Sequence, residues 1–140
     1  MQLSKLRKFS QAQYGQSYKT RPRLVINMTI TFEDFEKVDI RVGRVIEVED
    51  FPKARNPAFK LKIDFGPEIG VKTSSVQAVG AHTKEELQGM LVCCVVNFPP
   101  KKVADFTSDV LTLGFKNTEG IGWVLITPAK GSVDLGSKLS

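Results

Sequence analysis

The chain has 140 residues, of which 41% are hydrophobic and 25% charged, so length and composition predict one globular domain with a modest core. Its longest apolar run, at 90–96, is far shorter than the ~18 residues of a membrane span, so no such span is predicted. The single histidine, His82, and the adjacent Cys93 and Cys94 lack the spacing of a structural zinc site. We therefore predict no metal and no cofactor. Adjacent strand residues point to opposite faces, so the cysteines are predicted to be packed thiols, which fits a reducing cytoplasm.

The net charge of +5 is distributed unevenly. Residues 1–27 contain six Lys and Arg and no acidic residue, which leaves 14 basic against 15 acidic residues in 28–140. The basic character therefore belongs to the tail, and a near-neutral domain is unusual for a nucleic-acid binder. We interpret 1–27 as a poorly ordered or accessory segment that lacks a secretory apolar core. A transit peptide, an RNA-binding arm, or an upstream start with Met28 as the initiator remain alternatives.

The domain is predicted to begin at residue 28 with a short helix and a long strand. Thr31 can cap a helix, with Phe32 and Phe35 on one face of it. The segment 38–51 then alternates apolar and polar residues, as a half-buried strand does. Gly43 interrupts the alternation and predicts a bulge that bends this strand around a barrel.

Three further strands are predicted between residues 51 and 96. A proline-rich loop at 51–59 leads to a strand at 60–66, which alternates Leu61, Ile63 and Phe65 with polar residues. The segment 71–80 is a strand of small polar character, and Thr83 can cap one helical turn after it. The apolar run 89–98 is the most buried strand.

The stretch NFPPKK, 97–102, ends that strand, because proline has no backbone N–H to donate and fixes φ. It is either a sheet terminator with solubilising lysines or the rim of a binding site. A fifth strand is predicted at 108–115, then a hairpin loop at 116–122, a strand at 123–128 and a final edge segment at 131–139. Five strands, with the first long and bent and a helical turn between the third and fourth, predict an all-β OB-fold, a small Greek-key barrel.

Four segments together resemble the CsaA-type secretion chaperones, which are homologues of the tRNA-binding domain attached to some tRNA synthetases. They are FEKVDIRVGRV, FPKARNPAFKLKIDFG, VKTSSVQ and VVNFPPKKVADFTSDVLTLGF, and the resemblance covers about 29–140. It implies a non-enzymatic, homodimeric OB-fold protein that binds unfolded or pre-secretory polypeptides, whereas the tRNA-binding relatives recognise tRNA by its shape. Those relatives carry an Asn-x-x-Pro-[Lys/Arg]-[Lys/Arg] segment and a downstream serine, matched here by Asn97, Pro100, Lys101, Lys102 and Ser108. The chain departs from their pattern at Asp109, whose charge would repel phosphate.

Residues able to contact a ligand cluster in three segments. Aromatic, guanidinium, hydroxyl and amide groups there can stack on a base or a side chain, or satisfy an extended peptide. The candidates are Phe51, Arg55, Phe59, Ser74, Ser75, Gln77, Asn97, Phe98, Pro100, Lys101, Lys102 and Ser108. Each also has a structural interpretation, as loop packing, a water-facing strand or solvated charge. No nucleophile–base pair or phosphate-binding glycine loop is present in the sequence, so we predict no enzymatic activity.

We expect a cytoplasmic homodimer. The consecutive apolar residues at 123–126 need cover on both faces of their strand, and so does the helix with two phenylalanines. The predicted interface residues are Phe32, Phe35, Trp123, Leu125 and Ile126, on segments 29–37 and 121–139. The predicted ligand is a polypeptide, with tRNA as the alternative.

Overall fold

The computed structural model describes residues 28–140. The segment at the start of these residues contains helix α1, Phe32–Glu36. Thr31 caps it reciprocally: its hydroxyl accepts from the Asp34 amide at 3.1 Å, and the Asp34 carboxylate accepts from the Thr31 amide at 3.1 Å. The rings of Phe32 and Phe35 lie 6.2 Å apart, as expected for neighbours on one helix face. The predicted helix is confirmed.

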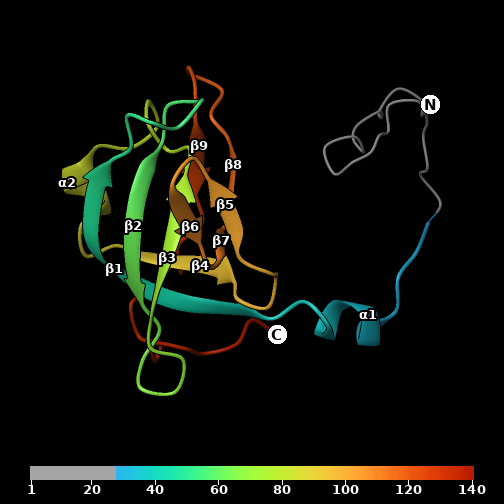
Figure 1. The fold of residues 1–140 in the computed structure, drawn as a ribbon. Helices are drawn as coiled ribbons and strands as arrows, with labels where there is room; N and C mark the ends of the chain where they lie inside the picture. The colour runs from blue at the N-terminus through green and yellow to red at the C-terminus, as the bar shows by residue number, and fades with distance from the viewer. Residues whose placement is uncertain (1–27) are drawn as a thin grey trace. The chain divides into compact units, whose positions relative to one another are not determined.

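Antiparallel strands form the barrel that follows (Figure 1). Five of them, in the order β3-β2-β1-β4-β7, make the main sheet, and the hairpins β5–β6 and β8–β9 form two separate two-stranded sheets. The strands are β1 Ile40–Asp50, β2 Phe59–Asp64, β3 Val71–Val76, β4 Leu91–Val95, β5 Lys101–Val103, β6 Phe106–Ser108, β7 Leu111–Thr112, β8 Gly114–Lys116 and β9 Trp123–Leu125. Helix α2, Lys84–Leu87, lies between β3 and β4. The predicted all-β OB-fold is confirmed.

Strand β1 bends around the barrel, pairing with β4 through its first half and with β2 through its second (Figure 1). The predicted bulge exists but lies at Ile46 instead of Gly43, because the register to β2 shifts between Val45 and Glu47. The Ile46 carbonyl accepts a hydrogen bond from the Gln88 side chain at 2.8 Å. Gly43 is required for packing: a Cβ there would lie 2.6 Å from Ile63 Cγ2.

The core fills the barrel with the inward residues of the alternating strands. Phe59, Leu61 and Ile63 of β2 are all buried, and Leu87 of α2 is fully buried in the same cluster. The predicted cap of α2 is confirmed, since Thr83 and Glu86 form a capping box. The side chain of His82 is mostly buried, being 13% exposed, and its Nε2 accepts a hydrogen bond from the Leu125 amide at 3.0 Å.

The predicted fifth strand is divided among three elements. Segment 106–108 pairs with β5, 111–112 with β4 and 114–116 with β9. The division occurs because the amides of Asp109 and Val110 both donate to the Thr73 carbonyl, which turns the chain toward β3. The last segment pairs with the start of β1: the Val42 amide donates to the Ser137 carbonyl, and the Leu139 amide to the Ile40 carbonyl. The prediction of a final edge segment is therefore confirmed.

Both cysteines are free thiols, as predicted. Cys94 is fully buried, and burial raises the pKa of its thiol to about 12, while burial raises that of Cys93 by less.

Within residues 28–140, no helix is long and apolar enough to cross a membrane. The same residues contain no cluster of three His, Cys, Asp or Glu side chains arranged to hold a metal ion.

The raised pKa of Cys94 predicts a loss of stability in alkali. Between about pH 9 and pH 12 the unfolded chain releases this thiol proton while the folded chain retains it, so the free energy of unfolding falls as pH rises, by up to about 1.4 kcal/mol per pH unit. Urea unfolding at pH 9, 10 and 11 should show a shallower decline for Cys94→Ala than for the parent protein. Equal slopes for the two proteins would contradict the assignment.

Candidate ligand-binding groove

A shallow groove lies on the outer face of β1, β2 and β3, beside the segment that follows β4. It is lined by Glu47, Glu49, Lys60, Leu61, Lys62, Thr73 and Phe106, and its cavity volume is about 30 Å³. OB-folds bind oligomeric ligands on this face, between the loop after the first strand and the loop before the last. This volume is far below the roughly 300–1,000 Å³ of small-molecule pockets, so the groove is a shallow contact surface and not an enclosed cofactor pocket.

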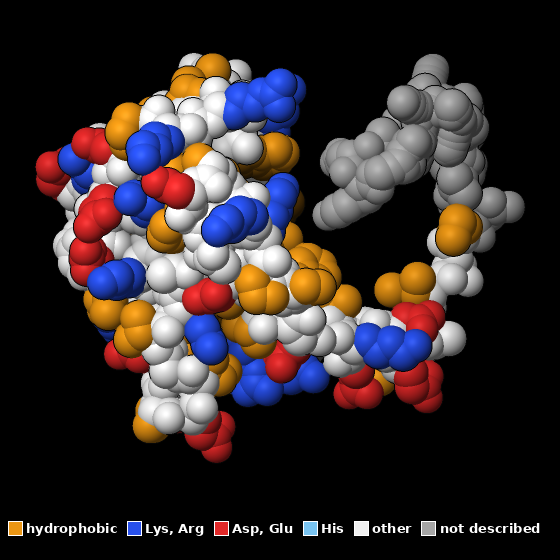
Figure 2. All heavy atoms as spheres, in the orientation of Figure 1, with side chains coloured by type: hydrophobic (Ala, Val, Ile, Leu, Met, Phe, Trp, Pro, Cys, Tyr) orange, Lys and Arg blue, Asp and Glu red, His pale blue; other side chains and the backbone are white. Residues whose placement is uncertain are grey.

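Two rows of opposite charge form the floor of the groove. Glu47 and Glu49 of β1 lie opposite Lys62 and Lys60 of β2 in the strand register, and each carboxylate is 3.5 Å from the facing ammonium. A side-chain contact with Glu47 and the pairing with Lys60 lower the pKa of Glu49, so this carboxylate is ionised at neutral pH. Figure 2 shows acidic and basic side chains intermixed on this side of the barrel.

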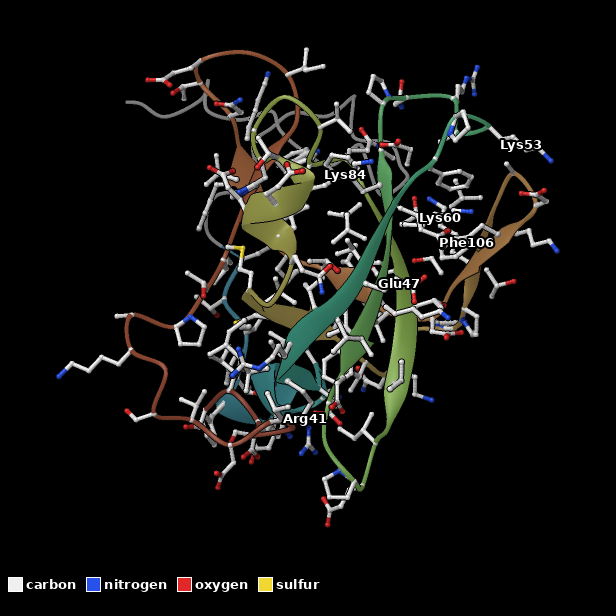
Figure 3. All side chains as sticks on the ribbon, turned by 90° about the vertical axis from the view of Figure 1, so that its left-hand side faces the viewer. Arg41, Glu47, Lys53, Lys60, Lys84 and Phe106 are labelled. Carbon is white, nitrogen blue, oxygen red and sulfur yellow. The ribbon has the colours of Figure 1, made fainter. Side chains whose placement is uncertain are left out.

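An aromatic contact forms one wall and joins two loops. The rings of Phe51 and Phe106 meet edge to face, with centroids 5.5 Å apart, and the Lys60 ammonium lies 5.5 and 5.6 Å from their centres. Lys53 and Asp105 bridge the same loops at 2.8 Å, and this contact lowers the pKa of Asp105 and raises that of Lys53. Lys53, Lys60 and Phe106 gather at this end of the barrel in Figure 3.

Two of the predicted aromatic contacts are buried. Phe51 is 5% exposed beneath Phe106, and Phe59 is 6% exposed within the core. The sequence reasoning had treated both as loop residues, but Phe59 begins β2 on its inward face. Neither ring offers a surface to a ligand in this structure, whereas Phe106 lines the groove.

The predicted hydroxyl contacts close the barrel between β3 and segment 107–112. Ser74 is fully buried, with its hydroxyl 2.7 Å from that of Thr112. The Ser108 hydroxyl accepts from the Ser75 amide at 3.0 Å and donates to the Val110 carbonyl at 3.1 Å. The carboxylate of Asp109, expected to repel a ligand, accepts from the amide and the hydroxyl of Thr73 at 3.2 and 2.9 Å. The small polar residues of β3 thus serve closure, a role the sequence reasoning missed.

Asn97 also makes structural contacts. Its side-chain oxygen accepts from the Asp39 amide at 3.0 Å, and its side-chain nitrogen donates to the Lys37 carbonyl at 2.8 Å. Both ends of the amide are therefore engaged in fixing the chain just before β1.

Asn97→Ala is expected to lower the free energy of unfolding by about 1–2 kcal/mol, because it removes two hydrogen bonds. Asn56→Ala, in an exposed loop, is the control and should change it by less than about 0.5 kcal/mol. Urea denaturation measures both. If Asn97→Ala left the free energy of unfolding unchanged, or if the variant were fully folded but lost ligand binding, the main role of Asn97 would not be structural.

The NFPPKK stretch ends β4 and leads into the β5–β6 hairpin. In this hairpin Lys101 is opposite Ser108, Lys102 is opposite Thr107, and Val103 is opposite Phe106. Since alternate residues share a face, Lys101 lies on the side of Phe106 and Lys102 on the other side. Lysine and proline at a sheet edge also hinder pairing with other chains, so both interpretations of this stretch fit its position.

The remaining predicted contacts are exposed: Arg55, Gln77, Phe98 and Pro100. Of the predicted interface residues, Leu125 is 5% exposed and belongs to the core, so its side chain cannot form a surface. Trp123 is 43% exposed and Ile126 is half-buried. Five residues that line the groove were not predicted as binding residues: Glu47, Glu49, Lys60, Lys62 and Phe106. Their alternation with apolar residues marked the first four as outward-facing, but only the pairing of β1 with β2 brings them together.

Comparisons with known proteins place this fold in a family. Residues 40–138 match the family described as "Putative tRNA binding domain". A CsaA chaperone from Picrophilus torridus is 46% identical, with a TM-score of 0.73 over 80% of this chain and 100% of that one. A CsaA chaperone from Bacillus anthracis str. Ames is 44% identical, with a TM-score of 0.73 over 81% of this chain and 100% of that one.

Methionine–tRNA ligases are also similar to the chain. The ligase of Parabacteroides distasonis is 37% identical over 130 residues, which are 92% of this chain but only 18% of the ligase. The chain thus corresponds to a small part of each such ligase. Its strand order, its motifs and these similarities agree: the chain belongs to the tRNA-binding-domain family of OB-fold proteins and is a CsaA-like member of it.

Proposed function

We propose that this protein is a non-enzymatic chaperone of the CsaA type that binds unfolded or pre-secretory polypeptides in the cytoplasm. The observation that carries the proposal is the groove itself, which combines an aromatic wall with paired charges of no net sign. The similarity of this chain to two CsaA chaperones, over the whole length of each, supports the same function.

An extended segment of the client would lie across the outer face of β1–β3. A client side chain would pack against Phe106, and the exposed Phe98 would provide a second apolar contact. Arg55, Gln77 and Lys101 would bind the carbonyl groups of the client. Because few contacts are sequence-specific, affinity should be modest and tolerant of sequence.

An aggregation assay tests the proposal. A chemically denatured reporter protein is diluted into buffer with full-length protein or with residues 28–140, and binding to a reduced, carboxymethylated polypeptide is measured in parallel. We expect suppression of aggregation and micromolar binding, both weakened by Phe106→Ala. Leu111→Ala, which trims an exposed apolar residue of β7 outside the groove and outside the proposed dimer segments, should have no effect. Failure of both assays with the parent protein would refute the proposal.

We also propose a homodimer, built from the β8–β9 hairpin and the segments 29–37 and 121–139. Phe115 and Val124 are directly opposite each other in the hairpin and are 71% and 43% exposed, while their neighbour Leu125 points into the core. Ile121 and Trp123 add to this exposed apolar surface. A two-fold axis would bury it against its own copy, and two grooves in one dimer would add avidity for long clients.

The second candidate function is tRNA binding. It is favoured by the family to which the chain belongs, by the exposed Arg55, Lys101 and Lys102, and by the six basic residues in 1–27. A gel-shift series in increasing salt decides, since each phosphate contact adds about 0.7–0.9 to the slope of log K against log salt. Equal, salt-sensitive affinity of full-length protein and residues 28–140 would support this candidate. Loss of affinity on truncation would assign the binding to the tail.

A further inference from the structure

The β2 lysines on the groove floor are neutralised by the neighbouring strand. Lys60 and Lys62 are the cations that β2 presents on this face, and each is opposite a β1 glutamate at 3.5 Å. The bulge at Ile46 contributes to this match, because it shifts the register of β1 just before Glu47. The charges therefore pair by strand register and not by chance proximity of long side chains.

The same neutralisation recurs at the rim. Lys53, in the loop after β1, forms its ion pair with Asp105 at the tip of the β5–β6 hairpin, where Ala104 adopts a positive φ of 53°. Three cations around the groove thus each have a carboxylate partner from another element. Phosphate binding draws its affinity from uncompensated cations that release counterions. A phosphate entering here would meet Glu47 and Glu49 beside the two lysines.

We infer that Glu47 and Glu49 are specificity-determining residues that reject polyanions and reserve this groove for a polypeptide. The inference rests on the proposed polypeptide-binding function and identifies what separates it from RNA binding on the same fold. Discrimination between two ligand classes commonly needs a repulsive element as well as an attractive one. A client's main chain carries no net charge, so two carboxylates do not oppose it, whereas they repel every phosphate that approaches Lys60 or Lys62.

The test compares full-length parent protein with Glu47→Gln/Glu49→Gln. The control is Glu68→Gln/Glu85→Gln, which changes the net charge equally but at exposed positions outside the groove and outside the proposed dimer segments. The probes are a 20-nucleotide single-stranded uridine RNA and a reduced, carboxymethylated polypeptide, each titrated from low to high salt. All three proteins share the basic tail, so differences between them report on the groove.

We expect the groove variant to bind the RNA roughly tenfold more tightly at low salt, with a log–log salt slope steeper by about 1.4, because two lysines become available to phosphate. The control should match the parent within about twofold. Thermal unfolding of each variant verifies that it is folded. If the double variant does not fold, the single variants Glu47→Gln and Glu49→Gln replace it, and each should show half of the change in salt slope. Equal RNA affinity of the groove and control variants would overturn the inference. If the parent binds no polypeptide, the proposed function fails, while the RNA comparison still decides the role of the glutamates.

Discussion

Replacing Phe115 or Ile126 with Asp is expected to raise the dissociation constant of the proposed dimer at least 100-fold. Either change would place a carboxylate inside an apolar interface, and an uncompensated buried charge costs about 3 kcal/mol or more. Phe115 is the more exposed of the two in the single chain, so its replacement should leave the folding of the barrel intact. Sedimentation velocity between 1 and 100 μM measures the shift from dimer to monomer.

Ile46→Asp is the matched control for this experiment. Ile46 is 42% exposed, almost the same as Trp123, but it lies on the β1 bulge, outside the β8–β9 hairpin. This variant should remain dimeric. Trp123→Ala should weaken the dimer by a smaller factor, because it removes contact area without adding charge. A parent protein that is already monomeric, or interface variants that stay dimeric, would refute the assignment of this surface.

Gly43→Val is expected to destabilise the barrel by about 3 kcal/mol, the second large effect, although valine favours strands. The added side chain would overlap Ile63 Cγ2 and the ring of Phe65, which lie 2.6 and 2.8 Å from the position of a Cβ. Both neighbours are fully buried in the core, so displacing them would disturb its packing. Chemical denaturation gives the difference in free energy directly.

Gly131→Val provides the comparison for Gly43, since nothing lies within 4 Å of a Cβ at Gly131. It should change stability by less than about 0.5 kcal/mol. If Gly43→Val were equally mild, β1 and β2 would have to separate locally. The glycine would then serve only backbone flexibility, as the sequence pattern alone had suggested.

The difference between these two explanations of Gly43 shows how far sequence reasoning extends. The interruption of an alternating strand by glycine correctly predicted a bent first strand with a bulge. It could not position the bulge, because the register shift at Ile46 depends on which β2 residue each β1 residue faces. That pairing also decides that Gly43 must leave room for Ile63 and Phe65.

The candidate site was predicted less well than the fold, for a related reason. Ser74, Ser108 and Asn97 are polar residues in loops or small-residue strands, and sequence cannot distinguish a polar group that awaits a ligand from one that satisfies the protein's own backbone. Each here has its partner in another element: Thr112, the Ser75 amide and the Lys37–Asp39 backbone. Conversely, Glu47 and Lys62 are ordinary surface residues until β1 and β2 align.

Local patterns therefore determined what can be read without knowing the neighbours of a residue. These are the period-two alternation of the strands, the Thr83 cap, the strand-ending prolines and the motifs of the family. Tertiary structure decided everything that depends on contacts between distant segments. It placed Leu125 in the core and Phe115 on the surface, used the serines and Asp109 to close the barrel, and set acid against base across the groove. The physical reason is that alternation fixes which side of a strand a residue occupies, whereas strand register and barrel closure fix what that residue faces.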